Sequence, residues 1–582
     1  MVNSKWHYSP QNTDHSPLAS GARTTHDLAA EEALNNRVVS ELLSQRGVTT
    51  VSEAKRFFFP SLADLHDPFL LEGMDKAVER LNKALGRKEK IMVFGDYDVD
   101  GTTAVALVYK YLQTFYSNIE YRIPTREDDG YGVTRRAVDE FKELGVGLVI
   151  ILDCGIKAND EVAYARSLGI DFIICDHHVP DAELPDAAAI LNPKLPGSRY
   201  PNPHLSGCGV GFKFMQGFSK SNGIAPDDLM GMLDLVAVSI AADIVPMTGE
   251  NRVMAYHGLR RLNRNPNLGL RAIMRICDLT SKTLTISDVI FKISPRINAS
   301  GRMQRGIEAV DLLTARDFAT ALAIAKSIDQ YNSDRKELDK RITHEANAII
   351  DRIAERLSGR RSMVIYNKDW HRGIIGIVAS RLTEIYYKPV VVLTLHNGLA
   401  TGSSRSVQGF DVYKAVENAR DLLENFGGHS YAVGLSMREE NIPEFTRRFE
   451  EYVAANITTE QLEPVVEPDT DITFSDITPY FLRTLKLFNP YGPGNEKPVF
   501  RTAEVSDFGT SKLVGKNNEH IKLEMVDETS GKVMDGIAFN MARQWEHVHS
   551  GAPFTIVYTI EENRHRAAKP GAFQLLVKDI IA

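Results

Sequence analysis

The sequence predicts an α/β protein with a parallel-sheet domain, a long helix, a second α/β domain and a small β-barrel. Three observations predict this class. Between residues 90 and 175, short apolar runs alternate with amphipathic helical patterns, as in βαβ units with parallel strands. A similar alternation returns after residue 359, and strand-like segments dominate after residue 465. At 582 residues, the chain has room for three or four domains of ~100–200 residues each.

The first 75 residues are expected to form a lead of short helices, one of them over 29–46, ahead of a parallel-sheet domain at 76–315. Apolar runs bounded by polar residues are typical of buried parallel strands. We therefore predict strands at 91–94, 148–152 and 172–175, with helices at 102–115, 134–144 and 160–168. Residues 179–211 are rich in Pro and Gly, so we expect an irregular loop there and helices again from about 227.

A single long helix is predicted next, because residues 317–356 contain neither Pro nor Gly and place apolar side chains at helical spacing. At ~1.5 Å per residue such a helix spans roughly 60 Å. We assign it, over 316–358, as a connector between domains, with a coiled-coil seam as the alternative. The second α/β domain, at 359–460, is expected to have strands at 363–366 and 390–394 and a helix at 373–385.

The last domain, at 465–582, is predicted to be a small barrel. Its five short strands are expected at 499–508, 520–526, 533–539, 554–559 and 573–578. Five strands at this spacing are typical of an OB-fold.

Composition excludes several classes of protein. No stretch approaches ~18 consecutive apolar residues, so no membrane span is expected. The N-terminus lacks the apolar segment of a secretory signal, which favours a cytoplasmic protein. The four cysteines are scattered, and we expect buried thiols rather than disulfides or zinc sites. A net charge of −8 argues against a general nucleic-acid coat but allows a local site where metal ions neutralise phosphates.

Carboxylates and histidines follow each predicted strand of the first domain. Because ligands gather beyond the carboxyl ends of parallel strands, these side chains are expected to lie together. An Asp also ends an apolar helical segment, where an unpaired carboxylate would be costly. The alternatives are a solvated acidic loop, a calcium loop or a structural cap. The candidate metal ligands are Asp96, Asp98, Asp100, Asp153, His177 and Asp243.

A mixed set of Asp and His ligands suits Mn²⁺ or Mg²⁺ better than structural zinc. Five or more ligands exceed the needs of one ion, so we predict two ions that share a carboxylate and promote hydrolysis of a phosphate ester. Asp153 is the predicted bridge, since it lies on the central strand. His177 is the predicted ligand of the pair, and His178 is predicted to contact the phosphate or move a proton, which makes His178 and Asp153 the candidate catalytic residues.

Four segments, GDYDVDGTTA, ILDCGI, CDHH and AADIVP, resemble in order the four motifs of the DHH phosphoesterase family. The likeness runs from KWHY near the N-terminus to the final β-rich region. This chain resembles most the branch of the family whose members are single-strand-specific 5′→3′ DNA exonucleases. It implies a DHH domain, a long helix, a DHH-associated domain and an OB-like domain. Where related pyrophosphatases carry a His, this chain has Phe94, and Asp96 adds a carboxylate typical of the exonuclease branch.

The resemblance also implies residues that bind the substrate. Ser403 and Arg405, in GSSRS, match a motif that receives the 5′ end of the strand, and His429 lies in a matching FGGH segment. Arg126 and Arg296 lie in predicted loops that look like phosphate-contacting segments. Without the resemblance, an ordinary Ser/Gly loop, a structural His and solvated arginines would be preferred.

The sequence thus predicts a two-metal exonuclease of single-stranded DNA that acts in DNA repair and recombination. One alternative is a phosphodiesterase of short oligonucleotides or cyclic dinucleotides, although such enzymes lack the extra β-rich domain. The other is a non-catalytic single-strand-binding protein, although such a protein would be free to lose its metal ligands. The resemblance implies a monomer that works with a helicase and a single-strand-binding protein.

Overall fold

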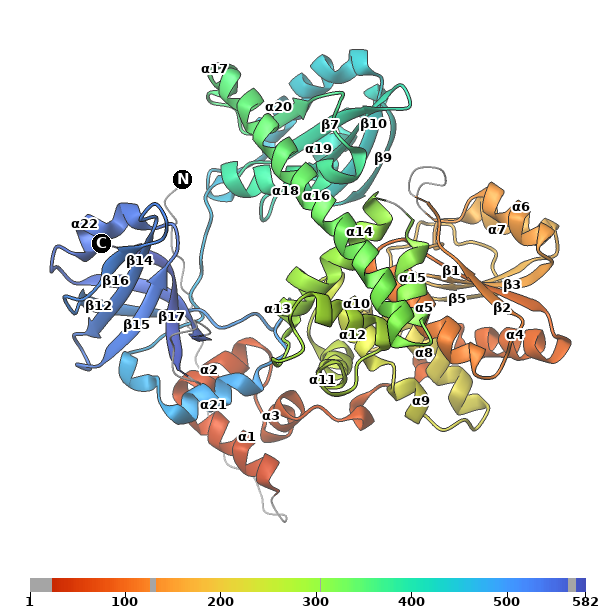
Figure 1. Cartoon of the computed structure of the whole chain (residues 1–582), viewed down its shortest axis with the longest axis horizontal. Coiled ribbons are helices and arrows are strands. Elements are labelled where there is room, and N and C mark those ends of the chain that lie inside the picture. Colours follow the sequence, from red (N-terminus) through yellow and green to blue (C-terminus); the bar gives the residue numbers. More distant parts are fainter. Residues whose placement is uncertain (1–23, 126–131, 304, 564–571, 582) are drawn as a thin grey trace. The chain divides into compact units, whose positions relative to one another are not determined.

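The computed structural model describes residues 24–125, 132–303, 305–563 and 572–581 (Figure 1). The chain divides into two compact units. The larger unit contains the N-terminal helices, the parallel-sheet domain and the C-terminal barrel, and the smaller unit is formed mainly by residues Asp329–Val466. In the described part of the chain, no helix is both long and apolar enough to cross a membrane.

A five-stranded parallel sheet organises the first domain, in the order β2-β1-β3-β4-β5. Apolar side chains of α6 and α7 pack on one face of the sheet, while α4, α5 and α8 contact it from the other side (Figure 1). Phe94 lies fully buried against Phe141 of α6. The strands are β1 (Lys90–Gly95), β2 (Ile119–Arg122), β3 (Val146–Leu152), β4 (Asp171–Cys175) and β5 (Ala189–Leu191).

Helices complete the larger unit. The N-terminal region has α1 (Thr25–Asn35), α2 (Arg37–Gln45), α3 (Val51–Phe58) and α4 (Met74–Arg87). The sheet domain adds α5 (Val99–Gln113), α6 (Arg135–Glu143), α7 (Asn159–Ser167), α8 (Gly207–Ser221), α9 (Asp227–Met230), α10 (Leu233–Ala242), α11 (Gly249–Arg264), α12 (Leu268–Ile276), α13 (Ile286–Asp288), α14 (Ser294–Met303) and α15 (Ile307–Thr314).

The expectation of an irregular loop over 179–211 is wrong at two places, because β5 and the start of α8 lie in it. Ser206 caps α8 by accepting a hydrogen bond of 3.1 Å from the amide of Gly209. The glycines of this helix allow close packing rather than a loop. A Cβ atom on Gly207 would lie 2.5 Å from the Cβ of Asp153, and one on Gly211 would lie 3.0 Å from Leu152.

The long helix α16 (Phe318–Arg352) has 35 residues, or about 52 Å at ~1.5 Å per residue. Its first part belongs to the larger unit and the rest to the smaller unit, so the connector interpretation is confirmed and the coiled-coil alternative is not needed. Ile342, Ala346 and Ile350 bury its second half in the core of the smaller unit.

The smaller unit has a mixed sheet in the order β6-β7-β8-β10-β9, with apolar clusters on both faces. The helix α18 and the second half of α16 cover one face, and α19 and α20 cover the other. The elements are α17 (Ala354–Leu357), β6 (Met363–Tyr366), α18 (Arg372–Tyr386), β7 (Val390–His396), β8 (Leu399–Arg405), α19 (Val412–Glu417), β9 (Leu423–His429), β10 (Ala432–Met437) and α20 (Ile442–Asn456).

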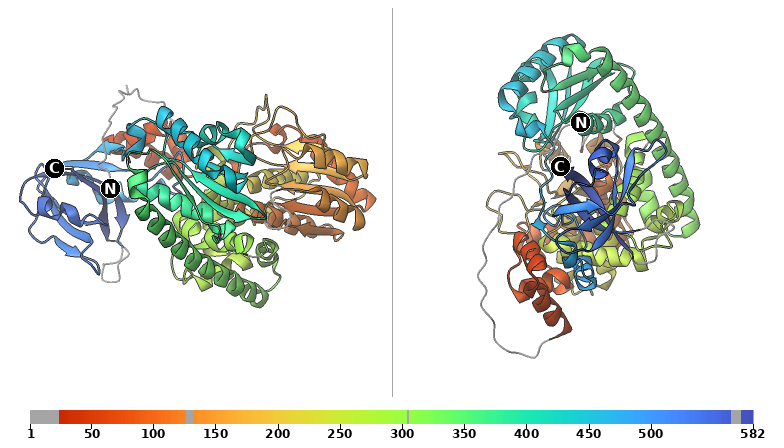
Figure 2. Two further views of the ribbon diagram at one scale, coloured as in Figure 1. Left: turned by 90° about the horizontal axis from the view of Figure 1, so that it is seen from above. Right: turned by 90° about the vertical axis from the view of Figure 1, so that its left-hand side faces the viewer.

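The C-terminal region forms a closed barrel, as predicted for an OB-fold (blue in Figures 1 and 2). Strands follow the order β12-β16-β17-β15-β14, and β14 pairs back with β12 to close it. The elements are β11 (Thr470–Asp471), α21 (Pro479–Leu487), β12 (Phe500–Asp507), β13 (Lys512–Val514), β14 (His520–Asp527), β15 (Val533–Ala538), α22 (Trp545–Val548), β16 (Phe554–Glu562) and β17 (Phe573–Ile581).

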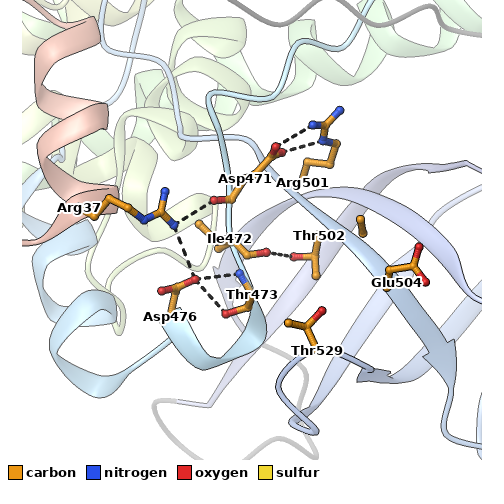
Figure 3. A pocket seen from close by; sticks show the side chains of 10 residues that line it. Arg37, Asp471, Ile472, Thr473, Asp476, Arg501, Thr502, Glu504 and Thr529 are labelled. Atoms are coloured by element: carbon orange, nitrogen blue, oxygen red, sulfur yellow. Dashed lines mark hydrogen bonds and ion pairs between the residues drawn. The ribbon is translucent and has the colours of Figure 1, made fainter. Parts of the chain in front are cut away.

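Helices α1 to α3 share one hydrophobic core with this barrel, although more than 400 residues separate them in sequence. Figure 3 shows a polar pocket at the junction, where Arg37 of α2 donates to the carbonyl of Asp471 and forms an ion pair with Asp476. Arg501 of β12 binds the Asp471 carboxylate through two hydrogen bonds of 2.7 Å. The lead is therefore part of the barrel's packing and not a separate appendage.

Candidate metal centre

The carboxyl ends of three neighbouring strands bring the predicted ligands together. Asp96 follows β1, Asp153 follows β3 and Asp176 follows β4, and these strands are adjacent in the sheet. Asp243 joins them from the end of α10. The four segments therefore meet beyond the carboxyl ends of the strands, at one edge of the sheet.

The loop after β1 is shaped by hydrogen bonds to its own carboxylates. Asp98 caps α5 by accepting a hydrogen bond of 3.0 Å from the amide of Gly101. Gly101 must lack a side chain, because a Cβ atom would lie 2.4 Å from the carbonyl oxygen of Asp96. In the first turn of α5, Asp100 points into the protein and is 1% exposed.

Three donors hold the carboxylate of Asp100. Its oxygens accept hydrogen bonds from the amides of Gly207 and Cys208, at 2.7 and 2.8 Å, and from the hydroxyl of Ser239, at 2.6 Å. The first two come from the N-terminus of α8, where unpaired amides favour negative charge. These contacts explain how a buried carboxylate is kept in one orientation.

Asp153 occupies an uncommon backbone conformation, with φ = 60°. Its side chain is buried, and the missing Cβ of Gly207 leaves the space that it fills. A non-glycine residue in this region carries strain that surrounding structure must support, and such strain is often found at functional sites.

The two histidines after β4 have different surroundings. The Nε2 atom of His177 lies 3.1 Å from Oδ1 of Asp153, 3.7 Å from Oδ2 of Asp243 and 3.8 Å from Oδ2 of Asp100. The Nδ1 atom of His178 instead lies 2.7 Å from Oδ1 of Asp176. His177 therefore faces the carboxylates, while His178 is more exposed and its ring is held at Nδ1 by Asp176.

The electrostatics of the centre favour a bound cation. Burial, followed by the charge of Asp100, raises the pKa of Asp98 and raises that of Asp153 well above its usual range. The same causes raise the pKa of Asp243 to about 8. Burial lowers the pKa of His177, so its imidazole is neutral near pH 7, the form that binds metals.

Three groups of side chains place ligand atoms within 4.8 Å of one another. They are Asp96, Asp98 and Asp153; Asp153, His177 and His178; and Asp100, His177 and Asp243. Each group combines oxygen and nitrogen donors, or oxygen donors alone, as Mn²⁺ and Mg²⁺ prefer. Because Asp153 belongs to two groups, its position suits a carboxylate shared by two ions. The residues present thus fit a two-metal centre.

The candidate substrate residues of the smaller unit lie on one face of its sheet. Arg405 pairs with Ala432, which in turn pairs with His429, so Arg405 and His429 share a row across β8, β10 and β9. Ser403 lies two residues before Arg405 and hence faces the same side. The Nη1 atom of Arg405 donates to the hydroxyl of Ser403 at 2.7 Å.

The expectation of a flexible GSSRS loop is wrong for its first four residues, which lie in β8. This strand pairs with β7 on one side and β10 on the other, so its amides belong to the sheet. Alternation explains the strand, because Ala400, Gly402 and Ser404 are buried while the residues between them are partly exposed. A ligand at this strand would therefore be contacted by side chains, such as those of Ser403 and Arg405, and not by the backbone.

The two remaining arginine candidates have different outcomes. Arg296 was expected in a loop, but it lies in α14, which continues directly from a π-helical turn over Val289–Ile293. Its Nη1 atom donates to the carbonyl of Lys292 at 2.6 Å. The same helix contacts the start of α5, directly after the loop that follows β1, since Asn298 accepts a hydrogen bond of 3.2 Å from the amide of Val99. Arg126 lies outside the described residues.

Sequence reasoning did not identify all the polar groups of the centre. Asp176 is fully buried and accepts hydrogen bonds from the amides of Ile156, His177 and His178, in addition to the His178 ring. Ser239 and the first amides of α8 hold Asp100. Lys194 lies near enough to Asp243 and Asp176 for their charges to favour its protonated form, although burial lowers its pKa. Asp176 had a sequence signal in the motif; Ser239 and Lys194 had none.

Family models match three parts of the chain. The DHH family N-terminal domain matches residues 90–240, the DHHA1 domain matches residues 359–455 and the RecJ OB domain matches residues 468–579. These three matches correspond to the parallel-sheet domain, the smaller unit and the barrel.

Curated relatives match across most of the chain. It is 36% identical to the single-stranded-DNA-specific exonuclease RecJ of Bacillus subtilis over 547 residues, which are 93% of this chain and 67% of the relative. The protein of the same name from Salmonella typhimurium is 32% identical over 93% of this chain and 95% of the relative.

A solved structure agrees with these matches. The crystal structure of RecJ in complex with Mn²⁺ from Thermus thermophilus superposes with a TM-score of 0.79 at 26% identity. The superposition covers 95% of this chain and 78% of that chain. The similarity therefore extends over all the domains described above.

Proposed function

Since the chain belongs to the RecJ family of DHH phosphoesterases, we propose that it is a metal-dependent exonuclease that degrades single-stranded DNA from the 5′ end. The observation that carries this proposal is the convergence of three ligand groups at one edge of the sheet, two of which share Asp153. The Bacillus subtilis relative is a single-stranded-DNA-specific exonuclease, and the Thermus thermophilus structure contains Mn²⁺.

We assign Asp96, Asp98 and Asp153 to one ion and Asp100, His177 and Asp243 to the other. Asp153 would connect the two sites, since its Oδ1 also lies 3.1 Å from Nε2 of His177. Two bound Mn²⁺ or Mg²⁺ ions would supply a water nucleophile at neutral pH and stabilise the leaving oxygen of the phosphodiester. The chain's own residues fix where this happens. Gly207 and Cys208 hold Asp100, and the strained backbone of Asp153 holds the shared carboxylate.

His178 is the catalytic residue that we assign to the phosphate. Burial lowers the pKa of its imidazole, but the hydrogen bond and charge of Asp176 outweigh this effect and raise the pKa overall. A protonated imidazole can donate a hydrogen bond to a phosphate oxygen, or a proton to the leaving group. Asp176 fixes the ring so that Nε2 is the atom available for this contact.

The smaller unit would bind the end of the strand. Ser403, Arg405 and His429 present a hydroxyl, a guanidinium and an imidazole on one sheet face, next to the small residues Ala432, Gly434 and Gly427. A guanidinium with a neighbouring hydroxyl suits a terminal phosphate. This arrangement supports a preference for the 5′ end.

The barrel would hold the strand further along. On its outer face, Lys512 pairs with Lys522, and His520 lies against the exposed ring of Phe539, with ring centroids 5.0 Å apart. Basic and aromatic side chains in neighbouring rows are suited to a phosphate backbone and to base stacking. We further infer that the protein acts as a cytoplasmic monomer in DNA repair and recombination, together with a helicase and a single-strand-binding protein.

The test compares the wild type, Asp153→Ala and Asp160→Ala, which removes an exposed carboxylate at the start of α7. Each protein is incubated with Mn²⁺ and single strands labelled at either end, with duplex DNA, single-stranded RNA and a dinucleotide as controls. We expect early loss of the 5′ label from single strands, absent in Asp153→Ala and unchanged in Asp160→Ala. Cleavage of the dinucleotide alone would replace the proposal with a small-substrate phosphodiesterase. Binding without cleavage would replace it with a single-strand-binding protein.

A further inference from the structure

Three consecutive polar residues at the start of α11 are buried, and they follow Asp243 by seven to nine residues. Glu250, Asn251 and Arg252 are 1%, 0% and 3% exposed. Buried polar groups require partners, and each of these three binds a different part of the larger unit. We call Glu250, Asn251 and Arg252 the α11 anchor.

Asn251 connects the two segments that flank the metal centre. Its Nδ2 atom donates to the carbonyl of Pro246 at 3.0 Å and to the carbonyl of His204 at 2.6 Å. Its Oδ1 atom accepts a hydrogen bond of 3.2 Å from Asn202. All the hydrogen-bonding positions of this amide except one lone pair are thus used within the fold.

One connected segment leads to a proposed metal ligand, and the other leads to a group that holds one. Pro246 lies three residues after Asp243, and His204 lies three residues before Gly207, whose amide donates to Asp100 at 2.7 Å. Asn251 therefore sets the distance between the peptide that carries Asp243 and the peptide that holds Asp100. His177 approaches both carboxylates, at 3.7 and 3.8 Å, so a change in that distance would alter its ligand group.

The backbone beside Asp243 needs such support. Ile244 has φ = 57°, which is rare for a β-branched residue, and its side chain is 61% exposed. A strained peptide with an exposed side chain is not held by apolar packing. Hydrogen bonds further along the segment must hold it instead.

Arg252 ties the same turn to the segment that precedes the barrel. Its guanidinium donates to the carbonyls of Phe57, Leu487, Phe488, Asn489 and Pro490, at 2.9–3.2 Å. It also lies 4.0 Å from the ring centroid of Phe57. In the loop before α11, the amide of Met247 donates to the carbonyl of Pro493 at 2.6 Å. The position of Asn251 therefore depends on the barrel's leading segment.

We infer that Asn251 is a positioning residue for the metal centre, and that Arg252 makes this positioning depend on the segment before the barrel. The inference rests on the proposed function, because it assumes that Asp100 and Asp243 bind a metal ion. Groups that orient metal ligands commonly change metal affinity by ~10–100-fold when they are removed.

The test measures Mn²⁺ binding by calorimetry and thermal unfolding, both without DNA, for the full-length wild type and Asn251→Ala. The matched control is Asn263→Ala, on the same helix. The Nδ2 atom of Asn263 also donates to two carbonyls, of Leu259 and Leu284, but neither segment leads to a metal ligand. Arg252→Lys tests the second part of the inference, because lysine cannot bind five carbonyl oxygens at once.

We expect Asn251→Ala to weaken Mn²⁺ binding about tenfold or more, Arg252→Lys to weaken it less, and Asn263→Ala to leave it unchanged. If Asn251→Ala does not fold, Asn251→Ser replaces it, since a hydroxyl can donate to one carbonyl but not to both. Wild-type affinity in the Asn251 variant, or equal weakening in Asn263→Ala, would overturn the positioning role. Wild-type affinity in Arg252→Lys would overturn the dependence on the barrel segment. A wild type that binds no Mn²⁺ would instead refute the proposed function itself.

Discussion

The carboxylate of Asp176 holds the imidazole of His178, with Oδ1 2.7 Å from Nδ1, and it accepts the His178 amide at 3.1 Å as well. Burial raises the pKa of Asp176, but the hydrogen bonds and charge of His178 outweigh it and lower the pKa to about 2. The contact is thus between a carboxylate and the histidine that we assign to the phosphate.

Asp176→Asn should reduce kcat by about 10–100-fold, because the His178 ring loses the carboxylate that orients it. The Mn²⁺ concentration for half-maximal activity should change much less, because the metal-binding carboxylates stay in place. Steady-state kinetics at several Mn²⁺ concentrations separate the two effects. Asp234→Asn is the control, since Asp234 is also buried but accepts from the amide of Asn267, away from the centre. A wild-type kcat for Asp176→Asn would contradict the assignment of His178.

Gly207→Ala should disrupt the shared carboxylate. The added Cβ would lie 2.5 Å from the Cβ of Asp153 and 2.7 Å from its Oδ1, so the Asp153 side chain must move. We expect Mn²⁺ binding to weaken at least tenfold, as measured by calorimetry. Gly86→Ala in α4 is the control, because a Cβ there meets nothing within 4 Å, and it should stabilise the helix by about 0.5 kcal/mol. Unchanged Mn²⁺ binding in Gly207→Ala would show that Asp153 is not a ligand.

Arg405→Lys should reduce the affinity for strands with a 5′ phosphate about tenfold. The planar guanidinium of arginine can donate to Ser403 and to a phosphate at once, whereas the single ammonium group of lysine cannot reproduce this geometry. Fluorescence anisotropy in the inactive Asp153→Ala background would compare 5′-phosphate and 5′-hydroxyl strands. The control is Arg420→Lys, whose guanidinium lies over the ring of Phe426 in the same domain. An equal loss for both strands would indicate general charge attraction rather than recognition of the end.

Asp288 provides a prediction about acid stability. Burial raises its pKa, but hydrogen bonds from Lys292, Lys282 and Thr285 outweigh burial and hold the pKa well below its ordinary value of 3.8. Because the folded-state pKa is the lower one, these contacts stabilise the fold above pH ~4 and are lost as the pH falls below it.

Asp288→Asn should therefore lower the free energy of unfolding by about 1 kcal/mol at pH 7, after allowance for solvent screening of its partly exposed lysine partners. The difference from the wild type should shrink as the pH falls from about 4 toward 2. Chemical denaturation across this range, with the exposed Asp535→Asn as a control, measures it. A difference that stays constant with pH would show that the charge of Asp288 does not stabilise the fold through these hydrogen bonds.

The metal centre could be predicted from local sequence because its ligands follow parallel strands. Asp96, Asp153 and His177 each follow a recognisable apolar run, and strand ends in a parallel sheet must meet. The barrel was predictable for a similar reason, since alternating apolar residues define its strands one at a time.

Other features depend on partners far away in sequence and carry no local signal. Asn251 bonds Pro246 nearby but also His204, 47 residues earlier, and Ser239 bonds Asp100 across 139 residues. The glycines of α8 were interpreted as a loop because the side chains that leave no room for a Cβ there, such as those of Asp153 and Leu152, are brought close only by folding. The strand β8 was obscured in the same way, since Gly402 and Ser403 have low strand propensity and are held by β7 and β10.

Removal of metal ions should reverse the stability order of the wild type and Asp243→Asn. Without a cation, Asp243 faces the charges of Asp100 and Asp98, and partial burial adds to the cost of its own charge, so the loss of that charge should stabilise the fold in a chelating buffer. With Mn²⁺ at 100 times its Kd, binding should stabilise the wild type by about 2.7 kcal/mol, whereas the variant lacks a ligand and gains less. Thermal unfolding at pH 8, with and without Mn²⁺, measures both values. A lower stability of Asp243→Asn in the chelating buffer would contradict this prediction. It would show that repulsion among these carboxylates does not destabilise the metal-free protein.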